Sequence, residues 1–365
     1  MGRPHAEQLD AVQATASEAL GERPGLVWEV PLAHAERGFR NKAKMVVGGT
    51  VEQPTLGILD RAGHGVDLRE CGLHEPALHA ALPVLAELVT RAGLTPYDIP
   101  ARRGELKHVI ATVAPDGGLM VRWVLRSTEA VPRLRKHLPW LRERLPGLVV
   151  AAVNLQPEHK AVLEGPDELL LTEEAALPLR LNGLDLRLRP QGFFQTNTAV
   201  AGALYAEAAS WTAGLGVRTA WDLYCGIGGF ALTLATGGVA EVTGVELSEE
   251  AVAGARQSAA RSGLTGARFV AADATSWAAA QQGVPDLVVV NPPRRGIGPE
   301  LAALLEGSRV GHVLYSSCHS GSLARDLEAM PSLAPVRGRV FDMFPQTAHH
   351  EMLLLLRRVR GDGHS

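Results

Sequence analysis

The sequence predicts an α/β protein in which residues 190–365 form a doubly wound, mostly parallel sheet and residues 1–189 form a preceding mixed α+β domain. Two observations lead to this prediction. After residue 190, apolar runs of strand length alternate regularly with stretches of helical spacing, which is the pattern of successive βα units. Before it, alternating apolar runs meet at short turns and are separated by longer helical stretches, which is typical of a mixed, sheet-rich domain.

The composition is that of an ordinary globular protein. The chain has 365 residues, of which 46% are hydrophobic and 21% are charged, and its formal net charge is -3. The length suggests about two or three domains, and the sequence pattern favours two. The small net charge excludes a polybasic tail, so any affinity for nucleic acid has to be local. No run of about eighteen apolar residues is present and the start lacks an apolar leader, so we expect a cytoplasmic protein without membrane contact.

The first domain begins with a helix predicted over residues 6–20, where apolar residues recur at helical spacing. A strand is predicted over residues 38–49. It places Arg40, Lys42 and Lys44 on one face, because side chains two residues apart share a face of a strand. These cations belong either to a solvated edge strand or to a ridge that contacts phosphate groups.

The rest of the first domain alternates helices with paired strands. We expect an apolar helix over residues 76–94, a hairpin within 105–126, a basic helix over 131–144, a strand over 148–157 and a second hairpin that ends near 189. The basic helix is either a solvated face or a local basic surface. Its cations and its histidine are Arg133, Arg135, Lys136, His137, Arg142 and Arg144.

The second domain has seven predicted strands. They cover residues 219–224, 241–246, 267–271, 286–291, 312–317, 336–343 and 351–356. The connections are long enough for crossover helices, except the one between the last two strands. We therefore expect the final strand to run antiparallel to the others.

A glycine-rich turn follows the first of these strands. The segment from Trp221 to Phe230 reads WDLYCGIGGF, which predicts a strand that ends in a sharp turn and opens a helix. Gly226, Gly228 and Gly229 remove side chains where the backbone has to turn and approach a ligand closely. The turn suits a nucleotide-like ligand, although a glycine cluster alone can also be a simple tight turn.

Polar residues beyond the carboxyl ends of parallel strands converge on one crevice. Glu246 is the last residue of the second strand and is placed to accept hydrogen bonds from ribose hydroxyls. Asn291 begins an Asn-Pro-Pro-Arg segment after the fourth strand, and Cys318 follows the fifth. An antiparallel last strand brings its first residue, Glu351, to the same edge. Cys318 and Glu351 are therefore predicted to be neighbours despite their separation in sequence.

Several motifs in order resemble those of the RNA uracil-C5-methyltransferase family. They are FFQTN, DLYCGIGG, VELS, NPPRRGIG, YSSC and FPQTAHHE. Three earlier segments, GFRNKAKMVV, RAGLTPY and RGELK, look most like the 23S rRNA (uracil-747-C5)-methyltransferase branch and not the tRNA branch. The resemblance covers essentially the whole chain. It implies a seven-stranded class I S-adenosylmethionine-dependent methyltransferase domain, Rossmann-like with an antiparallel last strand, after an RNA-binding domain.

The resemblance implies methyl transfer from S-adenosylmethionine to C5 of a uridine in 23S rRNA. Uracil C5 is a poor nucleophile, so the family adds a cysteine thiolate to C6, which turns C5 into an enolate carbon. Cys318 matches the nucleophile. Glu351 matches the base that removes the C5 proton so that the cysteine can leave. Cys225, inside the glycine turn, and Asp342, on the preceding strand, are the less well placed rivals.

The same resemblance assigns Gln195, Tyr224, Glu246 and Asn291 to binding of S-adenosylmethionine, with Asp273 as a less secure candidate near the adenine. A base within a duplex is out of reach, so the target uridine has to lie in a loop or be flipped out. The expected partner is 23S rRNA, held by the first domain. No membrane and no stable protein partner is implied.

Related enzymes of this branch carry four cysteines for an iron-sulfur cluster, and only Cys71 of this chain matches one of them. One thiolate cannot hold a four-iron cluster. Cys71, Cys225 and Cys318 also form no local metal-binding pair. We therefore expect no metal or cluster and a small buried role for Cys71. Two explanations of this difference compete: a start site assigned too late, or a lineage that lost the cluster.

Other functions remain open from the residues. The uridine could belong to another rRNA site or to tRNA. A methyltransferase for an exocyclic amine of adenine or guanine needs no cysteine, and usually has an aromatic residue where this chain has Arg294. A noncatalytic RNA-binding protein would need neither nucleophile nor base. A dinucleotide oxidoreductase shares the glycine turn and Glu246, but the Asn-Pro-Pro-Arg segment has no role in hydride transfer, and cofactor-binding calorimetry separates the two.

Overall fold

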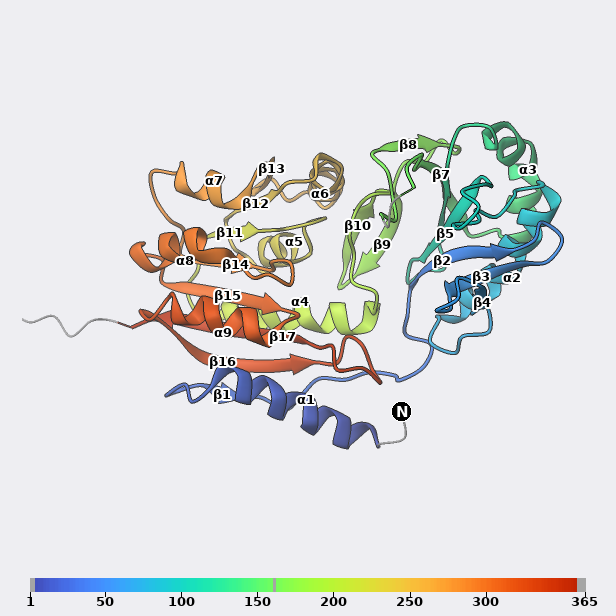
Figure 1. The fold of residues 1–365 in the computed structure, drawn as a ribbon. Helices are drawn as coiled ribbons and strands as arrows, with labels where there is room; N and C mark the ends of the chain where they lie inside the picture. The colour runs from blue at the N-terminus through green and yellow to red at the C-terminus, as the bar shows by residue number, and fades with distance from the viewer. Residues whose placement is uncertain (1–3, 160–161, 360–365) are drawn as a thin grey trace, which may run out of the picture. The chain divides into compact units, whose positions relative to one another are not determined.

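The computed structural model describes residues 4–159 and 162–359, and they form two compact units (Figure 1). Unit 1 contains the described residues up to Glu36, then Leu181–Arg187, and the chain from Gln191 onward. Unit 2 contains Arg37–Arg180 and Leu188–Pro190. The expected division at 189/190 differs from these units in two places, because the amino-terminal segment and Leu181–Arg187 both belong to unit 1. The amino-terminal segment belongs to unit 1, because β1 (Val27–Trp28) pairs with a strand of its sheet.

Unit 1 is built on an eight-stranded sheet of order β1-β16-β17-β15-β14-β11-β12-β13 (Figure 1). The seven strands that the sequence predicts are all present: β11 (Thr219–Leu223), β12 (Glu241–Glu246), β13 (Ala267–Ala271), β14 (Leu287–Val290), β15 (His312–Ser317), β16 (Leu333–Phe341) and β17 (Glu351–Arg358). Strand β17 is antiparallel to both of its neighbours, as expected, whereas β11 to β15 pair in parallel. The eighth strand is β1, which extends the edge beside β16.

Helices cover both faces of this sheet, and its central strand β14 is apolar throughout. All four residues of β14 are buried, as is typical of a parallel strand covered on both sides. One face packs against α1 (His5–Leu20), α7 (Ala274–Ala279), α8 (Gly298–Gly307) and α9 (Ser320–Glu328). The other face packs against α4 (Thr198–Ala213), α5 (Gly229–Thr236) and α6 (Glu249–Arg261). None of the helices within the described ranges is long and apolar enough to cross a membrane.

Side-chain caps start α6 and α7, two of the helices that follow the carboxyl ends of strands. Ser248 Oγ accepts a hydrogen bond from the Ala251 N–H at 3.3 Å and caps α6. Asp273 Oδ1 accepts one from the Ser276 N–H at 2.9 Å and caps α7. Each cap satisfies a backbone donor that the helix leaves unpaired. The loops before α6 and α7 are therefore held in place at the edge where a ligand crevice is expected.

Unit 2 has a seven-stranded sheet of order β4-β3-β2-β5-β6-β7-β8, in which only β6 and β7 pair in parallel. The strands are β2 (Lys42–Gly49), β3 (Pro54–Leu59), β4 (Gly65–Asp67), β5 (Leu106–Val113), β6 (Leu119–Leu125), β7 (Leu148–Leu155) and β8 (Asp167–Leu170). The helices α2 (Pro76–Arg91) and α3 (Val131–Arg144) pack against one face of this sheet and complete its core. The predicted hairpin of β5 and β6 is confirmed. A separate pair, β9 (Leu177–Leu181) and β10 (Leu184–Leu188), forms the second expected hairpin.

The basic strand β2 is not at an edge. It lies between β3 and β5, which excludes the solvated edge strand considered above. Lys42 is 9% exposed, and burial lowers the pKa of its ammonium group to about 8. Lys44 is exposed and pairs with Glu164 at 3.5 Å. Arg40 precedes the strand and donates from Nε to the Lys42 carbonyl oxygen.

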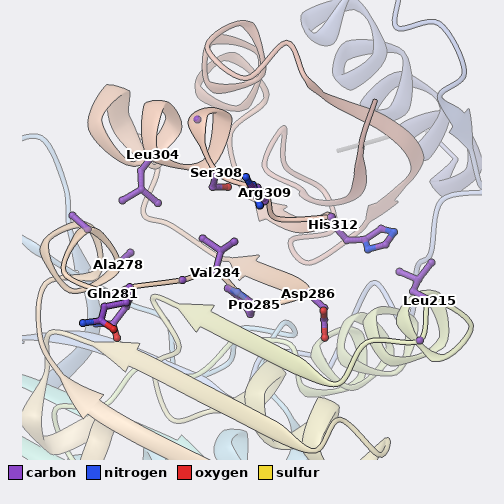
Figure 2. Close-up of a pocket in the computed structure, with 16 residues that line it drawn as sticks. Leu215, Ala278, Gln281, Val284, Pro285, Asp286, Leu304, Ser308, Arg309 and His312 are labelled. Atoms are coloured by element: carbon purple, nitrogen blue, oxygen red, sulfur yellow. The ribbon is translucent and has the colours of Figure 1, made fainter. Parts of the chain in front are cut away.

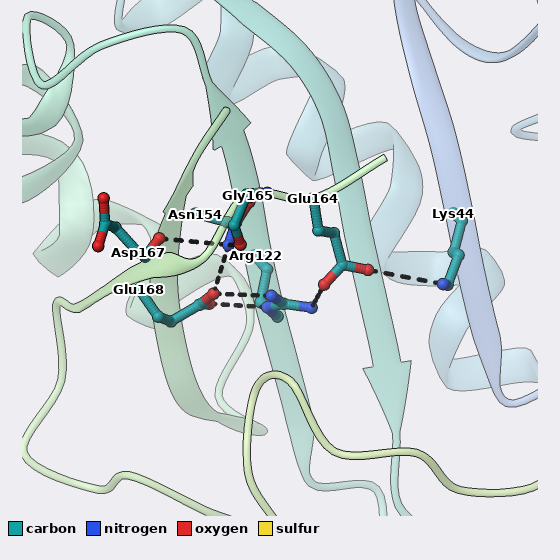
Figure 3. Close-up of polar contacts among 7 residues, drawn as sticks. All are labelled: Lys44, Arg122, Asn154, Glu164, Gly165, Asp167 and Glu168. Atoms are coloured by element: carbon teal, nitrogen blue, oxygen red, sulfur yellow. Dashed lines mark hydrogen bonds and ion pairs between the residues drawn. The ribbon is translucent and has the colours of Figure 1, made fainter. Parts of the chain in front are cut away.

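A buried arginine organises the polar side of the same sheet (Figure 3). Arg122, which is 1% exposed, donates through Nε and Nη2 to the two carboxylate oxygens of Glu168, each at 2.7 Å. Its Nη1 lies 2.6 Å from Glu164 Oε2, and Asn154 Nδ2 donates to Glu168 Oε2 at 2.9 Å. Burial alone would lower the pKa of Arg122, but the hydrogen bonds and charges of Glu168 and Glu164 raise it above its ordinary value. The cation is thus fully paired where it is buried.

Replacing Arg122 with methionine should lower the free energy of unfolding by about 3 kcal/mol, because it leaves two carboxylates without their partner. This figure is the lower end for breaking a buried ion pair, since Glu164 and Glu168 keep 24% and 15% of their side-chain exposure. Urea unfolding measures the effect. Arg126→Met is the matched control, because Arg126 is 44% exposed and lies 3.9 Å from Glu105, so we expect a change within about 0.5 kcal/mol. Equal effects of the two substitutions would contradict the structural role of Arg122.

Candidate active site

A cavity of about 640 Å³ opens at the carboxyl ends of the parallel strands of unit 1. Its lining includes every site residue predicted from the sequence, namely Gln195, Tyr224, Glu246, Asn291, Cys318 and Glu351. The motifs are spread over more than 150 residues of sequence, from Phe193 to Glu351, and the sheet brings them together because parallel strands end at one edge. Asp273 and Arg294 also line the cavity.

A second cavity, of about 830 Å³, lies at the opposite edge of the same sheet (Figure 2). Figure 2 shows Val284, Asp286, Ser308 and His312 around it, where β14 and β15 begin. Asp286 Oδ2 accepts hydrogen bonds from the backbone N–H groups of residues 218 and 219, so this carboxylate secures the start of β11. No residue of the predicted site lies there, and doubly wound sheets bind ligands at the other edge.

The glycine-rich turn has the conformation that its sequence predicts. Gly226 and Gly228 have φ values of 54° and 89°, in the left-handed region that favours glycine. A Cβ atom on Gly229 would lie 2.4 Å from Tyr205 Cζ, so a larger residue does not fit there. Tyr224 also has a positive φ, of 68°, which is uncommon for a residue with a side chain and marks a constrained position at the mouth of the cavity.

Two carboxylates hold the turn. Asp222, buried on β11, accepts a hydrogen bond from the Ala231 N–H at 2.9 Å, and burial raises the pKa of its carboxyl group to about 8. Glu246, at the end of β12, accepts one from the Gly226 N–H at 3.2 Å through Oε2 and one from the Ser248 N–H at 3.0 Å through Oε1. Each oxygen of Glu246 has a second lone pair, so the carboxylate at the cavity wall can still accept from a ligand hydroxyl.

Asp326, on α9, anchors the loop that continues from the Asn-Pro-Pro-Arg segment after β14. The Asp326 carboxylate Oδ2 accepts hydrogen bonds from the Ile297 N–H at 2.9 Å and from the Tyr315 hydroxyl at 2.6 Å. It therefore joins α9 and β15 to the loop that follows Asn291. The sequence offered no signal for Asp326, because its partners are distant along the chain.

Cys318 and Glu351 face each other across the last strand pair. The antiparallel register pairs Ser317 of β15 with Met352 of β17, so the next residues along this register are Cys318 and Glu351. Cys318 is half-buried and Glu351 is 3% exposed. This proximity, predicted from the expected direction of the last strand, depends on the antiparallel pairing that the structure contains.

The shared environment shifts the acidity of both groups. Burial raises the pKa of the Cys318 thiol, the nearby Glu351 carboxylate raises it further, and Arg294 opposes the rise. Burial raises the pKa of Glu351 to about 7, and the hydrogen bond from Ser316 opposes that rise. Glu351 can therefore exchange a proton near neutral pH, which suits a general base.

The two rivals named from the sequence differ from this pair. Cys225 lies inside the glycine turn at the cavity wall, and burial raises the pKa of its thiol well above the ordinary value. Asp342 follows β16, does not line the cavity, and lies 2.7 Å from Nε2 of His5. Neither has the mutual placement of Cys318 and Glu351.

Sequence reasoning gave no role to Tyr205, which lines the cavity, or to Ser316, which is buried beside Glu351. Tyr205 lies on α4, an apolar helix without a motif beyond its cap, and reaches the cavity beside Gly229. Ser316 lies on β15 in full burial and donates a hydrogen bond to Glu351. The YSSC segment contains this serine, but only the pairing with β17 shows what its hydroxyl contacts.

The cysteines present do not fit an iron-sulfur cluster. Cys71 lies in unit 2, whereas Cys225 and Cys318 lie in unit 1. Cys71 is half-buried in a turn, where its N–H donates to the Leu68 carbonyl oxygen at 3.1 Å, which corrects the expectation that it is buried. Within the part of the chain that the structure describes, no group of three or more His, Cys, Asp or Glu residues could hold a metal ion.

A solved structure shares this fold over nearly the whole chain. The Pyrococcus abyssi tRNA (uracil-54, C5)-methyltransferase, determined in complex with S-adenosyl-L-homocysteine, matches with a TM-score of 0.79 over 97% of this chain and 83% of that one. Its sequence identity to this chain is 23%, so the likeness concerns the fold. The doubly wound sheet and its antiparallel β17 give unit 1 the Rossmann-like fold of a methyltransferase domain.

Sequence comparisons give the family. Residues 173–359 match the family described as tRNA (Uracil-5-)-methyltransferase. Two relatives named 23S rRNA (uracil(747)-C(5))-methyltransferase RlmC, from Escherichia coli strain K12 and from Shigella boydii serotype 4, are each 48% identical over 355 residues, which is 97% of this chain and 94% of each relative. The chain belongs to this family of uracil-C5-methyltransferases.

Proposed function

We propose that this protein transfers a methyl group from S-adenosylmethionine to C5 of uridine 747 in 23S rRNA. Similarity to the RlmC proteins over nearly their full length supports this substrate. The observation that carries the chemistry is the placement of Cys318 opposite Glu351 at one cavity wall, which pairs a nucleophile with a base. An amine methyltransferase or an RNA-binding protein has no use for that pair.

Cys318 acts as the nucleophile. Its thiolate adds to C6 of the uracil, and the electron pair of the C5–C6 double bond becomes an enolate centred on C5 and O4. S-adenosylmethionine, when bound, supplies the methyl group that C5 attacks. Arg294 supports the thiolate, because its positive charge lowers the pKa of the Cys318 thiol.

Glu351 acts as the base. Its carboxylate takes the C5 proton, the C5–H electron pair forms the C5–C6 double bond again, and the C6–S bond breaks to return the thiolate of Cys318. A carboxyl group with an ordinary pKa would be a weaker base. Burial raises the pKa of Glu351 to about 7, so it is a stronger base and is still substantially ionised near neutral pH.

The residues around the glycine turn fit S-adenosylmethionine. A Cβ atom on Gly226 would meet nothing within 4 Å, so the backbone there is open to a ligand. We assign Gln195, Tyr224, Glu246 and Asn291 to its binding, with Glu246 accepting from the ribose hydroxyls. Asp273 has its Oδ1 engaged in the cap of α7, which makes it a lesser candidate.

Unit 2 holds the RNA around the target uridine in this proposal. Its helix α3 has exposed cations that include Arg135, Lys136 and Arg142, and such side chains bind phosphate groups. The expected location is the cytoplasm, where ribosomal RNA is made in bacteria, the source of the relatives named above.

The test is methylation of a 23S rRNA fragment containing uridine 747 with methyl-labelled S-adenosylmethionine. We expect one 5-methyluridine, mapped at position 747, and no label in a fragment with cytidine at that position. Unfractionated tRNA is the competing substrate. Label at another uridine would sink the assignment to position 747, and label on an exocyclic amine would sink the uracil mechanism.

A further inference from the structure

The base has one hydrogen-bonding partner beside it. Ser316 Oγ donates a hydrogen bond to Glu351 Oε1 at 2.5 Å. Both residues are buried: Ser316 is 0% exposed and Glu351 is 3% exposed. No other hydrogen bond to the side-chain carboxylate of Glu351 occurs among residues 4–159 and 162–359. One carboxylate oxygen is therefore tethered, and Oε2 is left for the cavity that Glu351 lines.

The tether comes from the strand that carries the nucleophile. Ser316 pairs with Leu353, and paired residues on neighbouring strands share a face of the sheet. Glu351 lies two residues before Leu353 on β17, so its side chain is on that same face. Cys318, two residues after Ser316, continues that face at the end of β15. The antiparallel pairing of β15 with β17 thus determines the separation of nucleophile and base.

Other titratable groups near Glu351 do not replace this contact. Tyr205 of α4 and Cys318 both have a pKa raised by burial and by the charge of Glu351. The charge of Asp222, on β11, also raises the pKa of the Tyr205 phenol. Arg294 and His349 line the same cavity, and neither donates a hydrogen bond to Glu351 in the described part of the chain.

We propose that Ser316 is a positioning residue for the base: its hydroxyl holds Glu351 Oε1 so that Oε2 faces the C5 proton and the carboxylate stays ionised. This inference rests on the proposed function and extends it to a residue that does not touch the substrate. It assigns Ser316 to the second half of the reaction, in which the methylated base leaves the cysteine. The first half, addition and methyl transfer, uses Cys318 and needs no proton from C5.

The two halves can be separated in a single turnover with labelled S-adenosylmethionine and the 23S rRNA fragment. For Ser316→Ala we expect the methylated covalent protein–RNA complex to break down about tenfold more slowly, while its formation changes by less than about threefold. The hydrogen bond favours the ionised carboxylate, so its loss raises the pKa of Glu351. Because the base has to be ionised, the acidic limb of the pH–rate profile should move up by about one pH unit.

Ser317→Ala is the matched control. Ser317 is also buried on β15, but its hydroxyl donates to the His319 carbonyl oxygen on the opposite face. We expect breakdown within about twofold of the wild type and an unmoved pH profile. Ser316→Thr keeps a hydroxyl and should restore most of the breakdown rate, whereas a merely structural role for Ser316 would not link the rate to the hydroxyl.

The outcomes distinguish this inference from the proposed function. If the wild type makes no 5-methyluridine, the proposed function itself fails. If the wild type is active and Ser316→Ala matches Ser317→Ala in both breakdown rate and pH profile, the role of Ser316 is overturned. Slow breakdown with a shifted acidic limb in Ser316→Ala alone supports it.

Discussion

Replacing Cys318 with alanine is expected to reduce methyl transfer by about four orders of magnitude or more, the scale seen when a covalent nucleophile is removed. Without addition to C6, uracil C5 has no enolate character and does not attack a methyl group. Alanine is smaller than cysteine and the site is half-buried, so folding should be preserved. The loss therefore reports on chemistry.

The measurement is trapping with a 23S rRNA fragment that carries 5-fluorouridine at position 747, in the presence of S-adenosylmethionine. Fluorine cannot be removed as a proton, so the wild type should remain attached to the RNA after denaturation. Cys318→Ala should give no such complex. Cys71→Ala removes a thiol from unit 2 and should trap as the wild type does. A complex that survives in Cys318→Ala would assign the nucleophile to another residue.

Replacing Glu351 with glutamine should lower turnover by about 10²- to 10⁴-fold, the usual contribution of a general base. Glutamine is nearly isosteric but cannot take the C5 proton. The first methyl transfer should proceed, and the methylated RNA should then stay attached to Cys318, so a covalent complex accumulates even with natural uridine. Gel analysis under denaturing conditions, with label in the methyl group, detects this complex.

Stability provides an internal check on Glu351→Gln. The pKa of Glu351 rises from 4.5 to about 7 on folding. Its contribution to the free energy of unfolding is therefore fully present below pH 4.5 and is lost as the pH rises through 7. At pH 8 the wild type contains a buried charge that glutamine lacks. Thermal unfolding of Glu351→Gln at pH 8 should therefore occur at or above the wild-type temperature.

Glu300→Gln, on the exposed surface of α8, is the control for a neutralised carboxylate and should retain normal turnover. Normal turnover in Glu351→Gln would show that another group removes the proton. Failure of Glu351→Gln to form any covalent complex would place Glu351 before methyl transfer instead of after it.

Local patterns in the sequence were sufficient for most of unit 1. Strands β11 to β17 follow from apolar runs separated by helical spacing, because each residue's face is set by its near neighbours. The short connection before β17 indicated its antiparallel direction, which the pairing with β15 confirms. Knowing the strand ends was then enough to expect Cys318 and Glu351 at one edge.

Other features had no local pattern. Strand β1 has two residues and was not predicted, and its pairing with β16 moves the amino-terminal segment into unit 1. The basic strand β2 was considered as an edge strand, and its central position appears only from the pairing with β3 and β5. Both depend on contacts between segments distant in sequence.

By itself, the sequence determined the order of strands and helices, the glycine turn, and the residue types at the crevice, since periodicity and motifs are local properties of the chain. Only the tertiary structure decided which oxygen of Glu351 is held by Ser316, that Asp326 anchors the loop after Asn291, and how burial raises the pKa of Glu351. Those properties arise from desolvation and from hydrogen bonds between strands that meet only after folding, and no spacing along the chain encodes them.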